Sequence, residues 1–211
     1  MTDDSLGSTQ RSMSRSVAQE FKRLPLRVHD FLAGVPLHDV WAIDLRRRRP
    51  GITLDEFLRA AAERPFTPSP VVRALVSIRL FLGRMLGWDR EPDVPMQDTF
   101  ARRLTTADLA KSLAPPGTRQ GLFRIVYRFE NEQLLELINR TAHAGALSAL
   151  VETDRAYRFY FAVYVRRVGP FTPVYMALID PFRKLIVYPS LLRSVRATWN
   201  RTCGESSRVM S

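Results

Sequence analysis

Cysteine, histidine and lysine are scarce in this chain, and each shortage bears on the kinds of site it can hold. The 211 residues include one cysteine, Cys203, which can form neither an internal disulfide nor the paired spacing of a structural zinc site. The three histidines, His29, His38 and His143, show neither an HxxxH nor an HExxH spacing. We therefore expect no metal site and no cofactor.

The shortage of lysine stands out because the chain is strongly basic. Of 32 basic residues only Lys22, Lys111 and Lys184 are lysines, so 29 arginines carry most of a formal net charge of +11. Such a charge raises the hypothesis of nucleic-acid or anionic-membrane binding. The arginines are spread along the chain, however, and the densest run, residues 46–49, has no interleaved aromatic residues on which bases could stack. We therefore do not favour nucleic-acid binding.

Long hydrophobic runs are also missing. No apolar run reaches about 18 residues, and no apolar segment follows a basic start, so neither a transmembrane segment nor a signal peptide is expected. A cytoplasmic location is the default prediction. Hydrophobic residues still make up 45% of the chain, enough for a sizeable core. Peripheral contact with anionic lipid stays open through a basic helix flank, Arg183, Lys184, Arg193 and Arg196.

The apolar pattern predicts one α+β domain over residues 25–200, with mobile tails at residues 1–24 and 201–211. A strand is expected over residues 36–45, and a helix over residues 53–64. A second helix is expected from Ser69, followed by a short one in residues 105–113. The strand places the following residues on one side at a period of two: Leu37, Trp41, Ile43 and Leu45.

Two of these helices carry capping signals. Thr53 and Glu56 have the spacing of a capping box, in which each side chain satisfies the other residue's free backbone donor. The short helix has a cap at Thr105 or Thr106. Both signals predict where a helix begins.

From residue 122 on, the apolar period changes to two and predicts an antiparallel meander. Phe123, Ile125, Tyr127 and Phe129 are expected on one face of the first of these strands. In the last strand, residues 157–168, one face carries alternating aromatic and aliphatic residues. The opposite face carries Tyr160 and Tyr164. One side of the sheet is therefore expected to face water.

The segment "YMALIDPFRKLIVYPSLLRSV", residues 175–195, combines a helical apolar stripe with Pro181 and Pro189. An internal proline costs a helix about 3 kcal/mol, but the stripe keeps one phase across both prolines. Burying four or five large apolar side chains at roughly 1.5–3 kcal/mol each offsets that cost. We expect one bent helix, or two coaxial pieces, lying on a curved sheet.

This order of elements resembles the helix-grip fold of START-like lipid-transfer domains, polyketide cyclases and birch-pollen-allergen-like proteins. The strings "YRFENEQLLELINRTAHAGALSALVE", "YRFYFAVYVRRVGPFTPVYMALIDPFRKLIVYP" and "FLGRMLGWD" resemble a bacterial family of uncharacterised domains, domain-of-unknown-function family 2867. The similarity covers about residues 28–197. Some members of that family are fused to short-chain dehydrogenase-like domains, but this chain has no GxGxxG motif, so no dehydrogenase function is implied.

What the resemblance implies is a curved sheet gripping a helix, with a cavity between them. The leading hypothesis is a non-enzymatic module that binds a small apolar or amphipathic ligand in this cavity. The candidate ligand-binding residues are Trp41, Phe123, Tyr127, Phe159, Tyr175 and Phe182.

Two alternatives stay open. One is a cyclase-like or dehydratase-like enzyme in which His143 acts as a general base with Glu132 or Asn139. Asn139, Thr141 and His143 would share a strand face opposite Glu136. The other is self-association or protein interaction through the sheet face that carries Tyr160 and Tyr164; the oligomeric state itself is not predicted.

Overall fold

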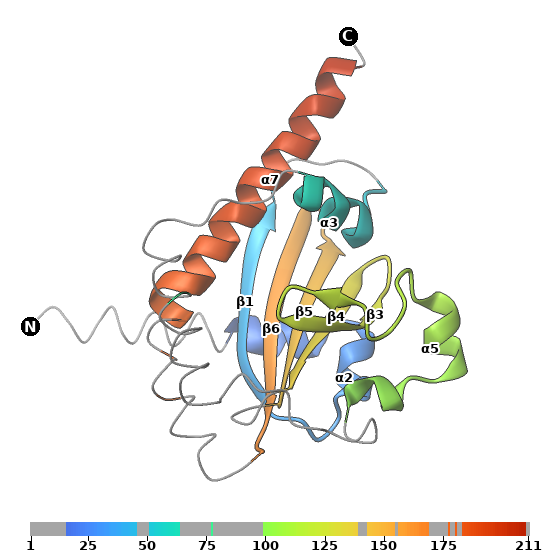
Figure 1. The fold of residues 1–211 in the computed structure, drawn as a ribbon. Coiled ribbons are helices and arrows are strands. Elements are labelled where there is room, and N and C mark those ends of the chain that lie inside the picture. Colours follow the sequence, from blue (N-terminus) through green and yellow to red (C-terminus); the bar gives the residue numbers. More distant parts are fainter. Residues whose placement is uncertain are drawn as a thin grey trace, which may run out of the picture.

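The computed structural model describes residues 16–45, 51–63, 77, 99–138, 143–154, 156–168, 177, 180 and 183–209 (Figure 1). A helical segment over residues 16–22 comes first. The elements that follow are α2 (Arg27–Phe31), β1 (Leu37–Leu45), α3 (Leu54–Glu63), the 3-10 turn η2 (Phe100–Arg103), α5 (Thr106–Lys111), β2 (Arg119–Gln120), β3 (Phe123–Arg128), β4 (Glu132–Ile138), β5 (His143–Glu152), β6 (Tyr157–Arg166), the π-helical turn η3 (Arg183–Val187) and α7 (Tyr188–Val209). Apart from residue 77, the helix expected from Ser69 lies outside the described residues. The arginine run 46–49 and Pro181 lie outside them as well.

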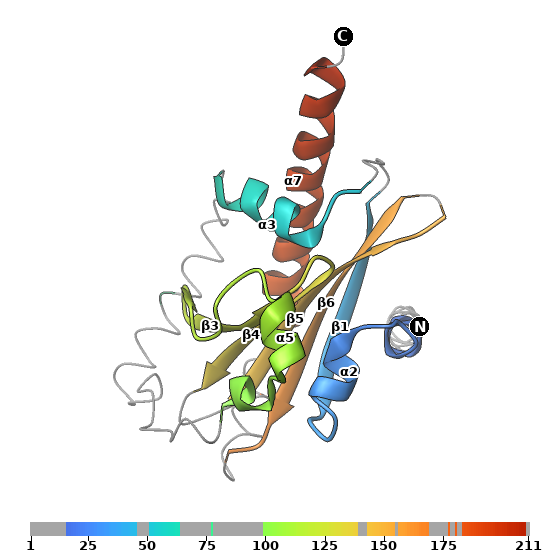
Figure 2. The same cartoon turned by 90° about the vertical axis from the view of Figure 1, so that its right-hand side faces the viewer.

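Within these ranges six strands form one antiparallel sheet in the order β1-β6-β5-β4-β3-β2. Strands β2 to β6 each pair with their neighbour in sequence, which confirms the predicted meander. Strand β1 pairs with β6 and so forms the opposite edge. Figures 1 and 2 show that the sheet is curved and that the long helix α7 runs beside it. This confirms the α+β class and is consistent with a helix-grip arrangement.

One face of the sheet, called here the N-terminal face, packs against residues 17–35 and η2. Phe21, whose side chain is fully buried, lies in this core with Tyr160 and Tyr164. The Tyr160 hydroxyl donates to Glu20 Oε1 at 2.6 Å. The expectation of a water-exposed face is therefore wrong. Phe21, in the segment predicted as a mobile tail, lies in this core. The N-terminal segment supplies the second layer that the strand pattern alone could not reveal.

The other face, called here the α7 face, packs against α3 and α7. Trp199 is fully buried, and its ring lies 5.7 Å from the ring of Phe57 on α3 and 5.2 Å from that of Tyr157 on β6. Helix α3 is held to the sheet by an ion pair between Asp55 and Arg128, whose Oδ1 and Nη1 atoms are 3.4 Å apart. The C-terminal helix thus grips the sheet, as predicted.

Two irregularities in strand pairing change which side chains share a face. Leu37 pairs with Tyr164 but Asp39 with Val163, so His38 is an extra residue in β1. As a result Leu37 packs on the N-terminal face, whereas Ile43 and Leu45 pack on the α7 face. One extra residue reverses the phase of a strand, so the predicted grouping of Leu37 with Trp41, Ile43 and Leu45 is wrong.

The local signals at helix starts are confirmed. The backbone amide of Glu56 donates to Thr53 Oγ1 at 3.2 Å. At α5 the cap is Thr105, which forms a reciprocal capping box with Asp108. These contacts connect residues three apart in the chain, and so the sequence pattern specifies them directly.

Pro189 is accommodated as the helical path passes from the π-helical turn η3 into α7. Proline has no N–H to donate, so it interrupts a regular series of helical hydrogen bonds. The spacing of those bonds changes from π to α at this point, which is why a proline can be placed here. Helix α7 then continues to Val209, and Cys203 is buried against the α7-face core. Cys203, in the segment 201–211 predicted as a mobile tail, therefore belongs to the core.

Candidate functional site

His143, the predicted general base, is buried in the N-terminal face. Its Nε2 lies 2.6 Å from Glu136 Oε1, and its side chain is 4% exposed. The ring stacks on Phe100 with centroids 4.0 Å apart. Glu136 Oε1 also accepts the backbone N–H of Phe100 at 2.5 Å. His143 and Glu136 together bind η2 to the sheet, which is a packing role.

Glu132, one of the two predicted partners of His143, lies far from it in the structure. Glu132 pairs with Ala149 and Ile138 with His143 on the β4–β5 ladder. Six residues of strand separate Glu132 from the position opposite His143, a distance of roughly 20 Å. Glu136 lies on the same face as His143 rather than opposite, because His143 pairs with Ile138, two residues from Glu136 on the adjacent strand. Asn139 lies outside the described residues.

Glu132 instead holds the first turn of α2. Its Oε1 accepts the Arg27 N–H at 2.6 Å, and its Oε2 accepts the Val28 N–H and the Tyr127 hydroxyl, each at 3.3 Å. Burial raises the pKa of Glu132 above its usual range, although these donors act in the opposite direction. Burial, together with the charge of Glu132, also raises the pKa of Tyr127 well above its usual value. This carboxyl group therefore connects the N-terminal segment to the sheet.

The predicted ligand-binding residues are divided between the two faces. A register shift between Ile125 and Tyr127 places Tyr127 on the N-terminal face, so it cannot line a cavity together with Trp41. Phe159 is buried where Phe57 packs on the sheet, with ring centroids 6.2 Å apart. Phe123 is half-buried on β3. Tyr175 and Phe182 lie outside the described residues.

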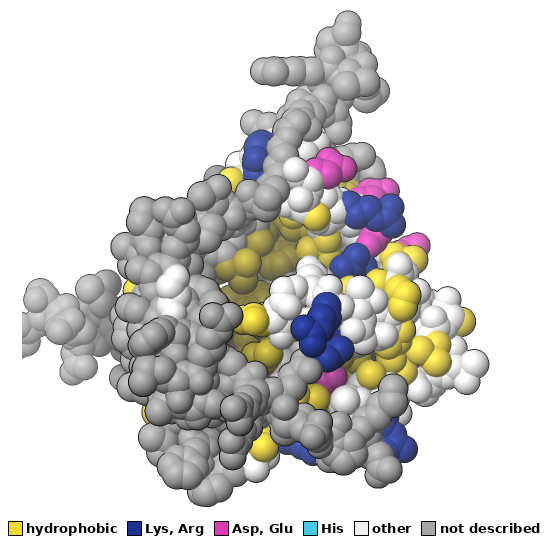
Figure 3. All heavy atoms as spheres, viewed as in Figure 1, with side chains coloured by type: hydrophobic (Ala, Val, Ile, Leu, Met, Phe, Trp, Pro, Cys, Tyr) yellow, Lys and Arg dark blue, Asp and Glu magenta, His cyan; other side chains and the backbone are white. Residues whose placement is uncertain are grey.

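The α7 face is incompletely covered around Trp41. Trp41 on β1 pairs with Phe161 on β6, and both side chains are only half-buried. Tyr188, in the first turn of α7, lies over them, with its ring 5.3 Å from Trp41 and 5.8 Å from Phe161. In Figure 3, hydrophobic side chains form the floor of a hollow near the centre of this face. These three aromatic residues, the aromatic group from here on, form an apolar surface at the start of α7.

A polar cluster adjoins the aromatic group: His38, Asp39, Asp180, Lys184 and Tyr188. His38 Nε2 lies 3.0 and 3.3 Å from the two carboxylate oxygens of Asp180 and 3.8 Å from Asp39 Oδ2. Lys184 Nζ lies 3.2 Å from Asp180 Oδ2 and 3.8 Å from Asp39 Oδ1. The Tyr188 hydroxyl donates to Asp39 Oδ2 at 3.3 Å, so Tyr188 belongs to both groups.

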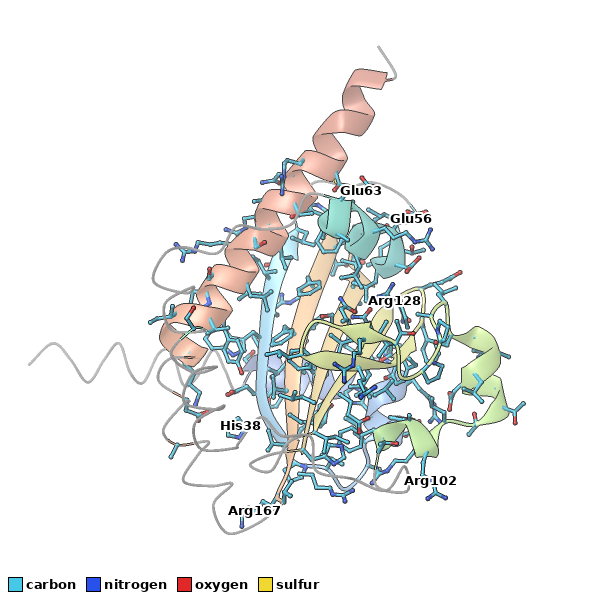
Figure 4. The ribbon with its side chains drawn as sticks, in the orientation of Figure 1. His38, Glu56, Glu63, Arg102, Arg128 and Arg167 are labelled. Atoms are coloured by element: carbon cyan, nitrogen blue, oxygen red, sulfur yellow. The ribbon has the colours of Figure 1, made fainter. Side chains whose placement is uncertain are left out.

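Local irregularities position this cluster. His38 is the extra residue of the β1 bulge, and Figure 4 shows it beside the end of β1 where the strand begins. Lys184 lies in the π-helical turn η3. Bulges and π-turns both re-aim side chains, and both are frequent at functional sites. His38 as a residue is exposed, but only 28% of its side chain is.

Sequence reasoning missed this cluster. His38 appeared only as one of three scattered histidines. His38 and Asp180 are 142 positions apart in the chain, so no motif connects them. The one local signal was the pair His38-Asp39 at the start of an otherwise apolar strand.

A metal centre is not assigned to the cluster. Atoms of His38, Asp39 and Asp180 that are able to bind a metal lie within 4.8 Å of one another. The ammonium group of Lys184, however, already contacts both carboxylates. It supplies the positive charge that a cation would bring, and a metal ion would have to displace it.

A separate cavity of about 280 Å³ opens at the other end of the sheet. It is lined by the β5–β6 hairpin, by the β3–β4 turn at Glu130 and Asn131, and by residues 25–26 and 51–53. None of the predicted site residues lines it, and it does not lie between α7 and the sheet.

Among the helices in the described ranges, none combines the length and the hydrophobicity needed to cross a membrane. Comparison with curated proteins and with solved structures found no match. Comparison with protein families matched residues 31–190 to the family described as "Protein of unknown function (DUF2867)". This match spans most of the 211 residues, including every strand and the start of α7. The chain belongs to the DUF2867 family.

Proposed function

We propose that this protein is a helix-grip binding module for a small amphipathic molecule, held on the α7 face where α7 begins. The observation that carries the proposal is the partly buried pair Trp41 and Phe161 beside a polar cluster. Both side chains are only partly buried, whereas Leu45 and Phe159 in the adjoining core are buried, and this partial exposure supports a ligand surface here.

The chemistry of this region fits an amphipathic ligand. An apolar body would lie on the aromatic group, and a polar group would reach His38 or Lys184. Covering about 300 Å² of apolar ligand surface gains roughly 7 kcal/mol before the costs of association. That gain supports micromolar binding when the association costs are small.

Native mass spectrometry of the protein, purified from its source cells without denaturation, tests the proposal. The expected result is an added mass from a bound small molecule, with a further gain in thermal stability when members of a lipid and aromatic library are added. Protein that is only empty and shows no thermal shift across that library would refute the proposal.

Two substitutions locate the binding surface. Phe161→Ala removes half of the aromatic pair and is expected to weaken binding about tenfold to a hundredfold, since a buried aromatic side chain contributes about 1.5–3 kcal/mol. Phe129→Ala is the matched control, because Phe129 is also half-buried but packs on the N-terminal face. Equal loss in the two variants would show that the effect is on folding rather than on the ligand.

A further inference from the structure

We propose that His38 and Asp180 form an acid–base dyad, with His38 Nδ1 as the general base for a substrate held on the aromatic group. The proposal rests on the proposed function, because an apolar surface has to bring the substrate to the ring. It adds a chemical step to what is otherwise a binding site, and it assigns that step to a different histidine from the one the sequence suggested.

The hydrogen bonds of His38 determine its tautomer. Nε2 faces two acceptor oxygens of Asp180 at 3.0 and 3.3 Å, and a carboxylate has no proton to donate. The neutral ring therefore carries its proton on Nε2, and Nδ1 keeps the lone pair. Within the described part of the chain, His38 forms side-chain hydrogen bonds only through Nε2. Nδ1 is the atom left to accept a proton.

Two carboxylates orient the His38 ring. Asp180 and Asp39 lie 3.0 and 3.8 Å from Nε2, and the Lys184 ammonium group contacts both carboxylates in turn. Tyr188 holds Asp39 in place by its hydroxyl bond. A carboxylate that orients and stabilises a histidine base is the arrangement used in catalytic triads.

The other two histidines cannot take this role. His143 is 3% exposed and lies between Glu136 and Phe100. His29 Nε2 is bonded to the backbone oxygen of Phe21 at 2.9 Å, inside the contact between the N-terminal segment and α2. Of the three histidines, His38 is the one that lies beside the aromatic group.

A generic reaction tests base catalysis without knowledge of the natural substrate. In 5-nitrobenzisoxazole, His38 Nδ1 would take the proton from C3, and the electrons of that C–H bond would form a nitrile. The ring N–O bond breaks, and its electron pair leaves on oxygen as a coloured phenolate. The imidazolium then returns its proton to water, so no oxidant, reductant or co-reactant is needed.

The experiment uses the full chain, and phenolate release is followed under saturating and subsaturating probe. We expect saturable turnover faster than that of free imidazole at the same concentration. His38→Gln should lower kcat about a hundredfold or more with little change in KM, the range expected for loss of a general base. Asp180→Asn should lower kcat as well, whereas Asp154→Asn, at an exposed carboxylate outside the cluster, should have no effect. Circular dichroism checks that each variant is folded.

Binding of 5-nitroindole, which has a similar shape but no N–O bond, is measured in parallel by equilibrium dialysis. If 5-nitroindole binds but His38→Gln turns over the probe at the wild-type rate, the dyad is refuted and the binding site stands. A His38→Gln variant that changes KM alone refutes it too, because His38 would then only bind. If 5-nitroindole does not bind and no turnover occurs, the dyad and the aromatic binding surface fail together.

Discussion

Replacing Glu132 by alanine separates a structural from a catalytic role for a carboxyl group that the sequence presented as a candidate acid or base. In the structure this group accepts the backbone N–H groups of Arg27 and Val28 and the Tyr127 hydroxyl. The hydroxyl can rotate to another acceptor, but the two amides cannot move without unwinding α2. A buried donor left without a partner costs about 1–3 kcal/mol, so Glu132→Ala should lower the free energy of unfolding by roughly 2–6 kcal/mol.

The charge on Glu132 adds a pH dependence with a definite sign. Burial raises its pKa in the folded protein above the ordinary value of 4.5. The folded state therefore binds the proton more tightly than the unfolded state. The contribution of Glu132 to stability is most favourable below pH 4.5, falls as the pH rises through the raised pKa and then stays constant. Glu132→Gln keeps one acceptor oxygen and has no ionisation, so it should abolish this fall.

Urea unfolding followed by far-UV circular dichroism measures both effects. Wild type, Glu132→Ala and Glu132→Gln are compared over a series of pH values from below 4.5 upward. Glu130→Ala is the control, because Glu130 is exposed in the neighbouring turn. If Glu132→Ala is as stable as Glu130→Ala, the role assigned to Glu132 is refuted. If the stability of Glu132→Gln changes with pH as steeply as that of wild type, the raised pKa of Glu132 is not the cause of the pH dependence.

Three other substitutions test the packing. Trp199→Ala should lower the free energy of unfolding, measured in urea, by about 3–5 kcal/mol, because its ring is fully buried between α3 and the sheet. A loss no larger than that of Trp41→Ala, at a half-buried side chain, would contradict the packing of α7 on the sheet. Phe21→Ala should cost a similar amount by the same measurement, and an unchanged midpoint would show that the N-terminal segment is not part of the core. Asp108→Asn should make the free energy of unfolding fall less steeply as the pH is lowered, because the hydrogen bond from Arg27 holds the pKa of Asp108 well below 3.8 in wild type. That stability is present above pH 3.8 and is lost as pH falls toward the lowered pKa. An acid slope equal to wild type would contradict this pair.

Much of the local structure could be predicted because it depends on near neighbours in the chain. The Thr53 cap, the Thr105 cap and the period-two strands of the meander all involve residues a few positions apart. The unbroken apolar stripe across Pro189 likewise predicted one bent helix or two coaxial pieces, and the structure has the π-helical turn η3 followed directly by α7.

The candidate site residues depend on longer-range contacts. His143 was a candidate general base in one alternative because polar residues surround it in sequence, but its spatial neighbours are Glu136 and Phe100, which make it part of a packed contact. Tyr127 was predicted on one face with Phe123 and Ile125 because the alternation is regular, but a one-residue register shift places it on the other face from Ile125. A side chain reverses its face with every such shift, and the hydrophobic pattern does not show where a shift occurs.

The sequence by itself determined the elements of this protein: an antiparallel meander, a capped helix after the first strand, and a C-terminal helix that tolerates a proline. Only the tertiary structure decided which face of the sheet each layer covers, and that His38 lies against Asp180. The physical reason is the distance along the chain between the residues that interact. Backbone periodicity and capping are satisfied within a few residues, whereas burial and a hydrogen bond across 142 positions depend on how distant segments pack.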